Sequence, residues 1–138
     1  MSEAAGGPRI AIAAAVVIHE GRVLVQTRPE GKAYAGSWEF PGGKIEADED
    51  APACAVRECR EELGLVVRPL APLDEVEWEY PGTAVHVTFV ECEPAGDVTV
   101  HAHDGQQVRW ANAETLPELE FLPANASVLA LLAERLTS

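Results

Sequence analysis

The chain has 138 residues, of which 23 are Asp or Glu and 10 are Lys or Arg, so its formal net charge is −13. This acidity excludes binding to duplex nucleic acid or to an anionic membrane through bulk charge, because Lys and Arg hold such partners. The length suits one domain, residues 1–138 with a flexible start at residues 1–8, and a hydrophobic content of 47% excludes general disorder.

Runs rich in β-branched and aromatic residues, bounded by turn residues, predict strands along much of the chain. In chain order these strands are residues 10–19, 23–28, 66–70, 75–80, 84–92, 98–100 and 108–110. The first two form a hairpin around Glu20-Gly21-Arg22, and Pro81-Gly82 and Pro94–Gly96 supply later turns. Residues 29–37 are expected to form a loop, and Pro41-Gly42-Gly43 to break any regular element.

Two helices are predicted, one central and one near the C-terminus. For the central helix Asp50 is a suitable N-cap and Gly64 a suitable stop after Leu63. Residues 124–136 are apolar at helical spacing and predict an amphipathic helix. Together these elements predict a mixed α/β domain built of layers.

The cysteines and the apolar runs indicate where the protein works. Cys54, Cys59 and Cys92 form no CxxC pair and no spacing typical of secreted disulfide scaffolds. The longest apolar run, residues 10–18, is too short to cross a bilayer and has no signal-like flanks. We therefore expect a soluble, unprocessed, cytoplasmic protein with reduced thiols.

The densest chemistry lies in the central helix, where Glu58, Glu61 and Glu62 fall within an arc of about 100°. Carboxylates at this spacing repel one another, and Arg57 and Arg60 offset only part of the repulsion. The cluster suits either a solvated helix face with ion pairs or a hard divalent cation such as Mg²⁺ or Mn²⁺.

The residues around this cluster resemble the Nudix box at every fixed position. The sequence reads Gly43, five residues, Glu49, seven residues, Arg57-Glu58-Cys59, one residue, Glu61-Glu62, one residue, Gly64-Leu65. Seven fixed positions match by chance with a probability on the order of 10⁻⁸ per window. Cys59 replaces an aliphatic residue of the pattern and is expected to pack as a small hydrophobe. The resemblance implies the Nudix fold, α/β/α, and a Mg²⁺-dependent hydrolase in which Mn²⁺ can substitute.

The resemblance also implies a set of metal ligands. These are Gly42, Gly43, Glu58, Glu61, Glu62 and Asp104. The glycines let backbone carbonyls approach a metal, and Glu58 or Glu61 would also act as the base for water. Asp104 stands where many relatives carry the longer Glu, so a simple loop turn is the alternative there. Arg57 would pair with Glu49 or Glu61 and hold the loop against the helix.

Two segments outside the box resemble MutT-type enzymes, which sanitise oxidised nucleoside triphosphates. Residues 38–44 also resemble pyrimidine-triphosphate pyrophosphohydrolases, and residues 121–125 resemble the segment that places an asparagine against the purine edge. The expected substrate contacts are Arg28 and Lys32 for phosphate, Phe40 for the base pocket and Asn125 for the base edge. Arg28 and Lys32 could instead form a solvated surface pair, and Phe40 could be a core residue. Asn125 could instead be the N-cap of the last helix. Tyr80 is expected to pack across strands.

These features predict a MutT-like pyrophosphohydrolase that converts a nucleoside triphosphate such as 8-oxo-dGTP to a monophosphate and pyrophosphate. One alternative is a Nudix hydrolase of CTP-like pyrimidine nucleotides, ADP-ribose or a dinucleoside polyphosphate. Another is a non-catalytic Nudix module that binds a nucleotide. Each version has a small-molecule nucleotide as its partner and neither duplex nucleic acid nor membrane, with the oligomeric state, monomer or homodimer, left open.

Overall fold

The computed structural model describes residues 9–136, so the expected flexibility of residues 1–8 concerns residues outside the described range. The strands are β1 (Ile10–His19), β2 (Arg22–Thr27), β3 (Trp38–Glu39), β4 (Gly42–Lys44), β5 (Val67–Tyr80), β6 (Thr83–Pro94) and β7 (Val108–Ala111). The helices are α1 (Ala51–Leu63) and α2 (Ala126–Arg135), with short 3-10 helices η1 (Leu116–Glu118) and η2 (Pro123–Asn125).

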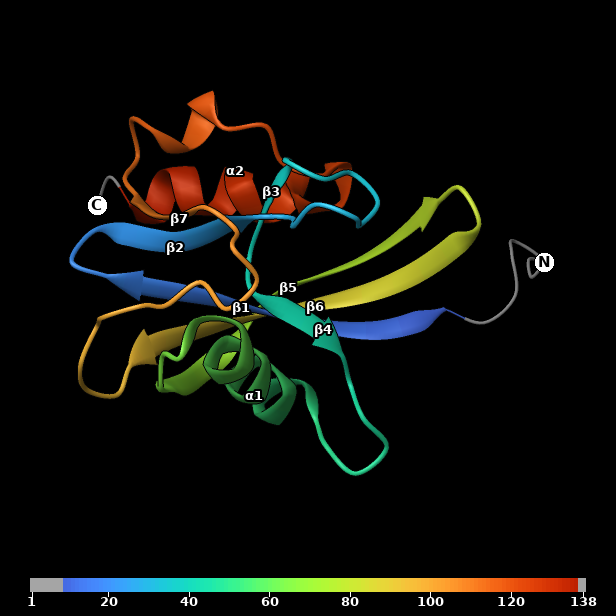
Figure 1. Ribbon diagram of the computed structural model, residues 1–138, viewed down its shortest axis with the longest axis horizontal. Coiled ribbons are helices and arrows are strands. Elements are labelled where there is room, and N and C mark those ends of the chain that lie inside the picture. Colours follow the sequence, from blue (N-terminus) through green and yellow to red (C-terminus); the bar gives the residue numbers. More distant parts are fainter. Residues whose placement is uncertain (1–8, 137–138) are drawn as a thin grey trace.

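Strand β1 lies at the centre of a mixed sheet with the strand order β3-β2-β1-β6-β5 (Figure 1). One edge of β1 pairs in parallel with β6 over residues 10–17. The other edge is divided between two antiparallel partners, because β4 pairs with residues 12–14 and β2 pairs with residues 18 and 19. Strand β7 pairs with the far edge of β2.

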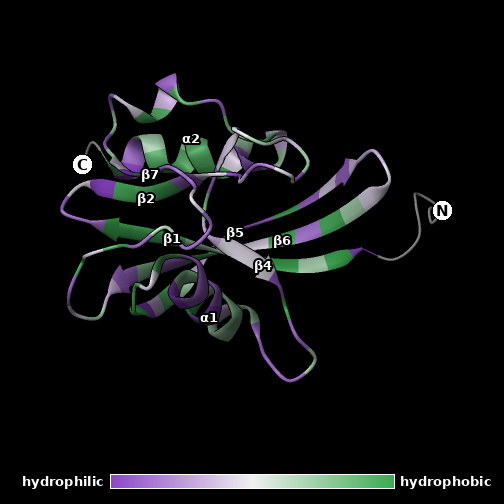
Figure 2. Ribbon diagram, in the orientation of Figure 1, coloured by the Kyte–Doolittle hydropathy of each residue, from purple (hydrophilic) through white to green (hydrophobic). Residues whose placement is uncertain are grey.

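Both faces of the central strands are buried. Ala14 and Val16 belong to the core that includes α2, whereas Ala15 and Val17 belong to the core that includes α1, because successive side chains point to opposite faces. Burial on both sides explains the nearly continuous apolar sequence of β1, which is coloured mainly as hydrophobic in Figure 2. Helices α1 and α2 cover opposite faces of the sheet (Figure 1), which confirms the predicted α/β/α fold.

The strand predicted at residues 98–100 is wrong. These residues are irregular, and the segment that follows them runs across the end of α1. There the His101 N–H donates to the Leu63 carbonyl at 2.8 Å, and the His103 N–H donates to the Glu62 carbonyl at 3.1 Å. The segment therefore satisfies helix carbonyls that have no partner within α1 and adds no strand to the sheet.

The two strands predicted at residues 66–70 and 75–80 form one strand, β5. Its pairing with β6 shifts register between Pro69 and Ala71 and again between Pro72 and Asp74. Proline has no N–H for the ladder, so it is tolerated on this outer strand and at such irregularities. The prolines thus interrupt the register without ending the strand.

The segment Pro41-Gly42-Gly43 also differs from expectation, since residues 42–44 form strand β4. A Cβ on Gly42 would lie 2.4 Å from the Ala13 carbonyl oxygen and 2.8 Å from the Ala14 Cα. Glycine is needed here because the backbones of β4 and β1 approach each other closely.

Neither helix within residues 9–136 combines the length and the apolar content needed to span a lipid bilayer. Cys54, Cys59 and Cys92 are buried free thiols. Cys59 is fully buried in the core beneath α1, which confirms that it packs as a small hydrophobe. Burial raises the pKa of its thiol to about 12.

Candidate active site

Helix α1 begins and ends where the sequence predicts. Asp50 is its N-cap, and the Asp50 side chain accepts a hydrogen bond of 2.9 Å from a backbone N–H of the first turn. Gly64 follows the helix in the left-handed conformation, with φ 67°, and its N–H donates to the Arg60 carbonyl. Cys59 is fully buried, so one side of the helix is fixed in the core while its glutamates lie outside the core.

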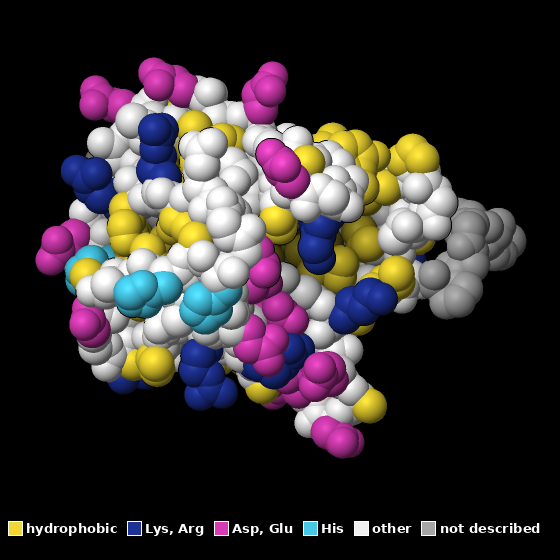
Figure 3. Space-filling view, in the orientation of Figure 1, with side chains coloured by type: hydrophobic (Ala, Val, Ile, Leu, Met, Phe, Trp, Pro, Cys, Tyr) yellow, Lys and Arg dark blue, Asp and Glu magenta, His cyan; other side chains and the backbone are white. Residues whose placement is uncertain are grey.

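The glutamates of α1 face an acidic cavity of about 300 Å³. The cavity is lined by Gln26, Arg28, Pro29, Lys32, Glu39, Gly42, Glu58, Glu61, Glu62, Asp104 and Gln106. The fold thus brings the three helix glutamates together with Asp104, from the loop between β6 and β7. Figure 3 shows acidic side chains gathered at the centre of one face, beside a hollow and near basic side chains.

The loop that carries Asp104 is fastened to α1 by histidines that the sequence analysis left without a role. Besides its backbone bond to Glu62, His103 contacts the Glu61 carbonyl through ring atom Nδ1. On the other side of Asp104, the Gln106 Oε1 accepts the Asp104 N–H at 3.0 Å. Asp104 is exposed at the edge of the acidic cavity and keeps its carboxylate available to a ligand.

Arg57 holds the loop before α1 and two of the helix glutamates in one network. Its Nε and Nη2 donate to both carboxylate oxygens of Glu49, at 3.0 and 2.6 Å. Its Nη1 donates to Glu58 at 3.0 Å and to Glu61 at 3.2 Å. The guanidinium lowers the pKa of the Glu49 carboxyl to about 2. Arg57 is predicted to pair with Glu49 or Glu61, and it pairs with both.

Glu62 and Glu39 lie deeper in the cavity, and both are held by one amide. Gln26 Nε2 donates to Glu62 Oε1 at 2.6 Å and to Glu39 Oε2 at 3.2 Å. Burial, together with a hydrogen bond to the Glu58 carboxyl, raises the pKa of Glu62. Burial also raises the pKa of Glu39, although Arg28 opposes this effect. Carboxyl groups crowded in a partly buried place favour a cation beside them.

The predicted metal ligands carry the oxygen atoms that a hard divalent cation prefers, but they do not form a metal cage. Within residues 9–136, no three Asp, Glu, His or Cys side chains converge to enclose a metal. Mg²⁺ does not need such a cage, because one or two carboxylates commonly hold it while water and phosphate oxygens complete its coordination. A Cβ on Gly43 would lie 2.5 Å from Glu58 Oε2. Because glycine has no Cβ, the Glu58 carboxylate can pack directly against the backbone of β4.

A second cavity, of about 410 Å³, adjoins the acidic one and shares Arg28, Lys32, Glu39 and Gly42 with it. Its wall is largely apolar and aromatic. The lining includes Ile12, Ala14, Tyr34, Phe40, Gly43, Tyr80, Val85, Val87, Phe89, Leu122 and Asn125. The fold therefore brings Phe40 and Asn125 together with Arg28 and Lys32, as the sequence analysis expects for a base and a phosphate chain.

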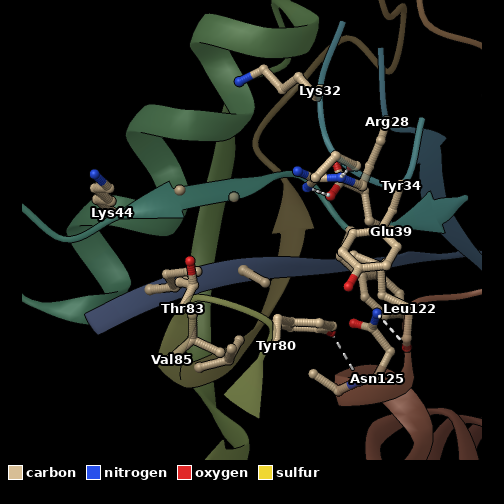
Figure 4. Close-up of a pocket in the computed structure, with 18 of the residues that line it drawn as sticks. Arg28, Lys32, Tyr34, Glu39, Lys44, Tyr80, Thr83, Val85, Leu122 and Asn125 are labelled. Atoms are coloured by element: carbon tan, nitrogen blue, oxygen red, sulfur yellow. Dashed lines mark hydrogen bonds and ion pairs between the residues drawn. The ribbon is translucent and has the colours of Figure 1, made fainter. Parts of the chain in front are cut away.

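The aromatic wall is built by contacts between rings from distant segments. Phe40 stacks on Phe121 with ring centroids 5.5 Å apart and meets Phe89 edge-on at 6.0 Å. The Tyr80 ring lies 5.5 Å from that of Tyr34, and its hydroxyl accepts the Ala124 N–H at 3.2 Å. Tyr80 thus lines the cavity (Figure 4) instead of only packing across strands.

Asn125 occupies the N-cap position of α2, but its side chain makes no capping hydrogen bond. Its Nδ2 instead donates to the Leu122 carbonyl at 3.0 Å, and the amide faces the aromatic cavity (Figure 4). The alternative of a side-chain helix cap is therefore wrong. The Asn125 carbonyl oxygen is in a position to accept a hydrogen bond from a molecule in this cavity.

The two expected phosphate contacts differ in their surroundings. Arg28 donates from Nη1 to Glu39 Oε1 at 2.9 Å and from Nε to the Ala33 carbonyl at 2.7 Å. Arg28 is therefore tied to the cavity wall and to the loop at residues 29–37, and it is not part of a solvated pair. Lys32, an exposed residue of that loop, lines both cavities.

Sequence reasoning missed the polar side chains that join the two cavities. The sequence indicates no role for Gln26, Glu39 or Gln106, and it indicates only a loop position for Tyr34. One signal was present, because Gln26 interrupts the apolar run of β2 and a polar residue in a buried strand needs a partner. The partners of Gln26 come from β3, α1 and the loop between β6 and β7. Local sequence does not indicate that these segments contact one another in the fold.

Comparisons with known proteins agree with this geometry. The family model described as NUDIX domain matches residues 8–132. The chain is 32% identical over 120 residues to a CTP pyrophosphohydrolase of Escherichia coli strain K12, covering 87% of this chain and 88% of that protein. It is also 32% identical over 130 residues to an 8-oxo-dGTP diphosphatase of the same organism, covering 90% and 96%. The solution structure of the E. coli ORF135 protein superposes with a TM-score of 0.76 at 32% identity, covering 94% and 96% of the two chains.

Proposed function

The chain belongs to the Nudix family, and on that premise we propose that it is a Mg²⁺-dependent nucleoside triphosphate pyrophosphohydrolase of the MutT type. One observation carries the proposal: an aromatic cavity and an acidic cavity adjoin and share Arg28, Lys32, Glu39 and Gly42. A nucleotide has the same two-part character, with a flat apolar base at one end and a charged phosphate chain at the other. The base would occupy the aromatic cavity and the phosphates the acidic one.

The acidic cavity supplies the chemistry. Glu58, Glu61 and Glu62, with Asp104 and the backbone of residues 42 and 43, would hold Mg²⁺ or its substitute Mn²⁺. Bound metal neutralises charge on phosphate oxygens and lowers the pKa of water. Water attack on phosphorus breaks one phosphoanhydride bond and releases nucleoside monophosphate and pyrophosphate. The proton that water loses would pass to a cavity carboxylate, for which Glu58 and Glu61 are the candidates.

Arg57 takes no part in bond breaking in this scheme. Its hydrogen bonds to Glu49, Glu58 and Glu61 hold the carboxylates against the loop before α1. Lys32 would contact the phosphate chain directly, while Arg28 secures the loop that carries Lys32 through its bond to Ala33.

The substrate we favour is an oxidised purine triphosphate such as 8-oxo-dGTP, so that the protein would sanitise the nucleotide pool and protect DNA. Support comes from the diphosphatase relative and from Asn125, whose carbonyl can accept an N–H that oxidation places on the purine ring. A pyrimidine triphosphate is the second candidate, because a relative of equal identity is named CTP pyrophosphohydrolase. The amino group of cytosine would also donate to Asn125.

The setting we propose is the cytoplasm, with residues 1–138 acting as one domain on free nucleotides. Three buried free thiols suit a reducing compartment. The net charge of −13 disfavours duplex nucleic acid as a partner.

The deciding experiment is a substrate panel with purified protein. Nucleoside monophosphate formation is measured by anion-exchange chromatography with 8-oxo-dGTP, dGTP, CTP, 5-methyl-dCTP and ADP-ribose, with Mg²⁺ and with excess EDTA. We expect EDTA to abolish turnover and 8-oxo-dGTP to show the highest kcat/KM, since specificity is a ratio of these constants. Replacing Glu61 or Glu62 by Gln is expected to reduce kcat by about 10²-fold or more.

Glu114→Gln is the matched control, because Glu114 is exposed and lies outside both cavities. Its turnover should equal that of the wild type. The highest kcat/KM with CTP or 5-methyl-dCTP would replace the purine assignment by the pyrimidine one. Tight nucleotide binding without turnover of any compound would contradict the enzyme and favour a binding module.

A further inference from the structure

Gln26 lines the acidic cavity beside Glu39, which lines both cavities. Gln26 lies in β2, is 2% exposed, and uses both ends of its amide in hydrogen bonds. Nε2 donates to Glu62 of α1 at 2.6 Å and to Glu39 of β3 at 3.2 Å. Oε1 accepts from Gln106 Nε2 at 3.2 Å. One side chain therefore joins the acidic helix, the wall of the aromatic cavity and the loop that carries Asp104.

The orientation of this amide is set by its neighbours. Nε2 lies within hydrogen-bond distance of one carboxyl oxygen of Glu39 and one of Glu62, so its two hydrogens face these two oxygens. The oxygen then faces Gln106, whose own oxygen accepts the Asp104 N–H at 3.0 Å. The chain of hydrogen bonds has one consistent direction, from the backbone of Asp104 through two amides to two carboxylates.

A neutral donor at this place has a specific advantage over a cation. Arg57 already pairs with Glu58 and Glu61, and Arg28 already pairs with Glu39. A further Lys or Arg beside Glu62 would neutralise the charge that a metal needs. Glutamine holds one Glu62 oxygen in place and leaves the negative charge of the carboxylate uncancelled.

We propose that Gln26 is a positioning residue that orients Glu62 toward a divalent metal and couples it to Glu39 at the boundary with the aromatic cavity. The inference rests on the proposed function, since it takes Glu62 as a metal ligand. Groups that hydrogen-bond metal ligands typically change metal affinity or activity by about 10- to 100-fold when removed. In this scheme Gln26 lines the acidic cavity but acts on the metal through Glu62.

The test uses Gln26→Met, which keeps the length of the side chain and removes its hydrogen bonds. Mn²⁺ binding to the protein alone is measured by electron paramagnetic resonance of free Mn²⁺, so the readout does not depend on turnover. We expect the dissociation constant to rise about tenfold. In steady-state assays kcat at limiting metal should fall in proportion while the nucleotide KM at saturating metal stays near that of the wild type. Raising Mn²⁺ about tenfold should restore turnover.

Gln107→Met is the matched control, because Gln107 is the exposed neighbour of Gln106 in sequence and lines neither cavity. It should bind Mn²⁺ as the wild type does. Unchanged Mn²⁺ affinity in Gln26→Met, with weakened binding in Glu62→Gln, would overturn the inference and leave the proposed function intact. Weakened Mn²⁺ binding in Gln26→Met, with no hydrolysis by the wild type, would sustain the inference and reject the proposed function.

A second variant covers the case in which Gln26→Met fails to fold. Gln106→Met removes the donor that fixes Gln26 Oε1 and also the acceptor of the Asp104 N–H, whereas both bonds from Gln26 Nε2 to carboxylates can persist. We expect a smaller loss of Mn²⁺ affinity in the same direction. Wild-type affinity in this folded variant, or a wild-type protein that binds no Mn²⁺, overturns the inference.

Discussion

At the scale of single residues, the adjacent glycines Gly42 and Gly43 of β4 are required for different reasons. The space for a side chain at Gly42 is taken by the backbone of β1, whereas at Gly43 it is taken by the Glu58 carboxylate. A backbone cannot move without disturbing the sheet, but a glutamate side chain can rotate away. The same substitution at the two positions should therefore separate stability from activity.

Gly42→Ala is expected to destabilise the protein by about 2 kcal/mol or more, because its Cβ would lie 2.4 Å from the Ala13 carbonyl. Gly43→Ala should melt within a few degrees of the wild type but lose about 10²-fold in kcat, since the Glu58 carboxylate must move. Thermal melts and steady-state assays of both variants measure this. Gly96→Ala, with nothing near its Cβ position, is the control. Equal loss of stability in both glycine variants would contradict the argument.

Residue roles were predictable from the sequence where the chemistry is local. The box glutamates follow from spacing on one helix, and the bond between Arg57 and Glu49 follows from an arginine near a loop acid. Gln26 and Glu39 could not be placed, because their role arises only when β2, β3 and α1 meet. Asn125 was ambiguous, since a residue before a helix can cap it or face a cavity with equal plausibility from sequence alone.

At the scale of elements, α1 and α2 are held to the sheet by different means. Helix α1 has a side-chain N-cap at Asp50 and a glycine stop at Gly64. Helix α2 lacks a side-chain cap and is anchored by Val128 and Leu132, both fully buried, and by Arg135 in its last turn. These local signals made the ends of α1 predictable to within a residue. The strand prediction for residues 98–100 failed because a β-branched run forms a strand only when a partner strand pairs with it.

The bond between α2 and β6 should make stability depend on pH. Arg135 donates to both Glu91 oxygens, at 2.9 and 2.5 Å, and these bonds lower the pKa of Glu91. A lowered folded pKa means that the stabilisation is present above the unfolded value of about 4.5 and is lost as pH falls through the folded value. Arg135→Gln should therefore cost about 0.5–1 kcal/mol at pH 7.

Urea unfolding of the wild type and Arg135→Gln at pH 7 and pH 3 measures this difference. The gap between the two proteins should shrink at pH 3, where protonation of Glu91 weakens the pair in the wild type. Arg68→Gln is the control, since Arg68 and Glu93 form a more exposed pair with side chains 59% and 42% exposed. A gap that is constant with pH would show that Arg135 stabilises α2 by packing alone.

At the scale of the whole molecule, two hydrophobic cores share one strand. Because β1 contributes to both cores, loss of either helix layer exposes the same central strand. The layered fold was predictable, since strand and helix patterns alternate as an α/β domain requires. The division of one β1 edge between β2 and β4 was not, because Pro-Gly-Gly is typical of a break in regular structure, whereas here its glycines allow the close approach of β4 to β1.

Leu132→Ala should lower the free energy of unfolding by about 3 kcal/mol, because Leu132 is fully buried in the core under α2. Circular dichroism and tryptophan fluorescence should report the same lowered midpoint, since both cores depend on β1. Leu131→Ala, at a residue 42% exposed, should change stability by less than about 0.5 kcal/mol. Two separate transitions would show that the layers unfold independently.

The parallel pairing of β1 with β6 sets the order in which a nascent chain can fold. Strand β1 leaves the ribosome early, but its partner over residues 10–17 begins only at Thr83. During that interval an apolar strand that is buried on both sides in the finished protein has its longest edge unpaired. Closing so long a loop is entropically slow, and an exposed strand edge invites association with other chains. We therefore expect the nascent chain to be most prone to aggregation, and most dependent on chaperones, between the synthesis of β1 and that of β6.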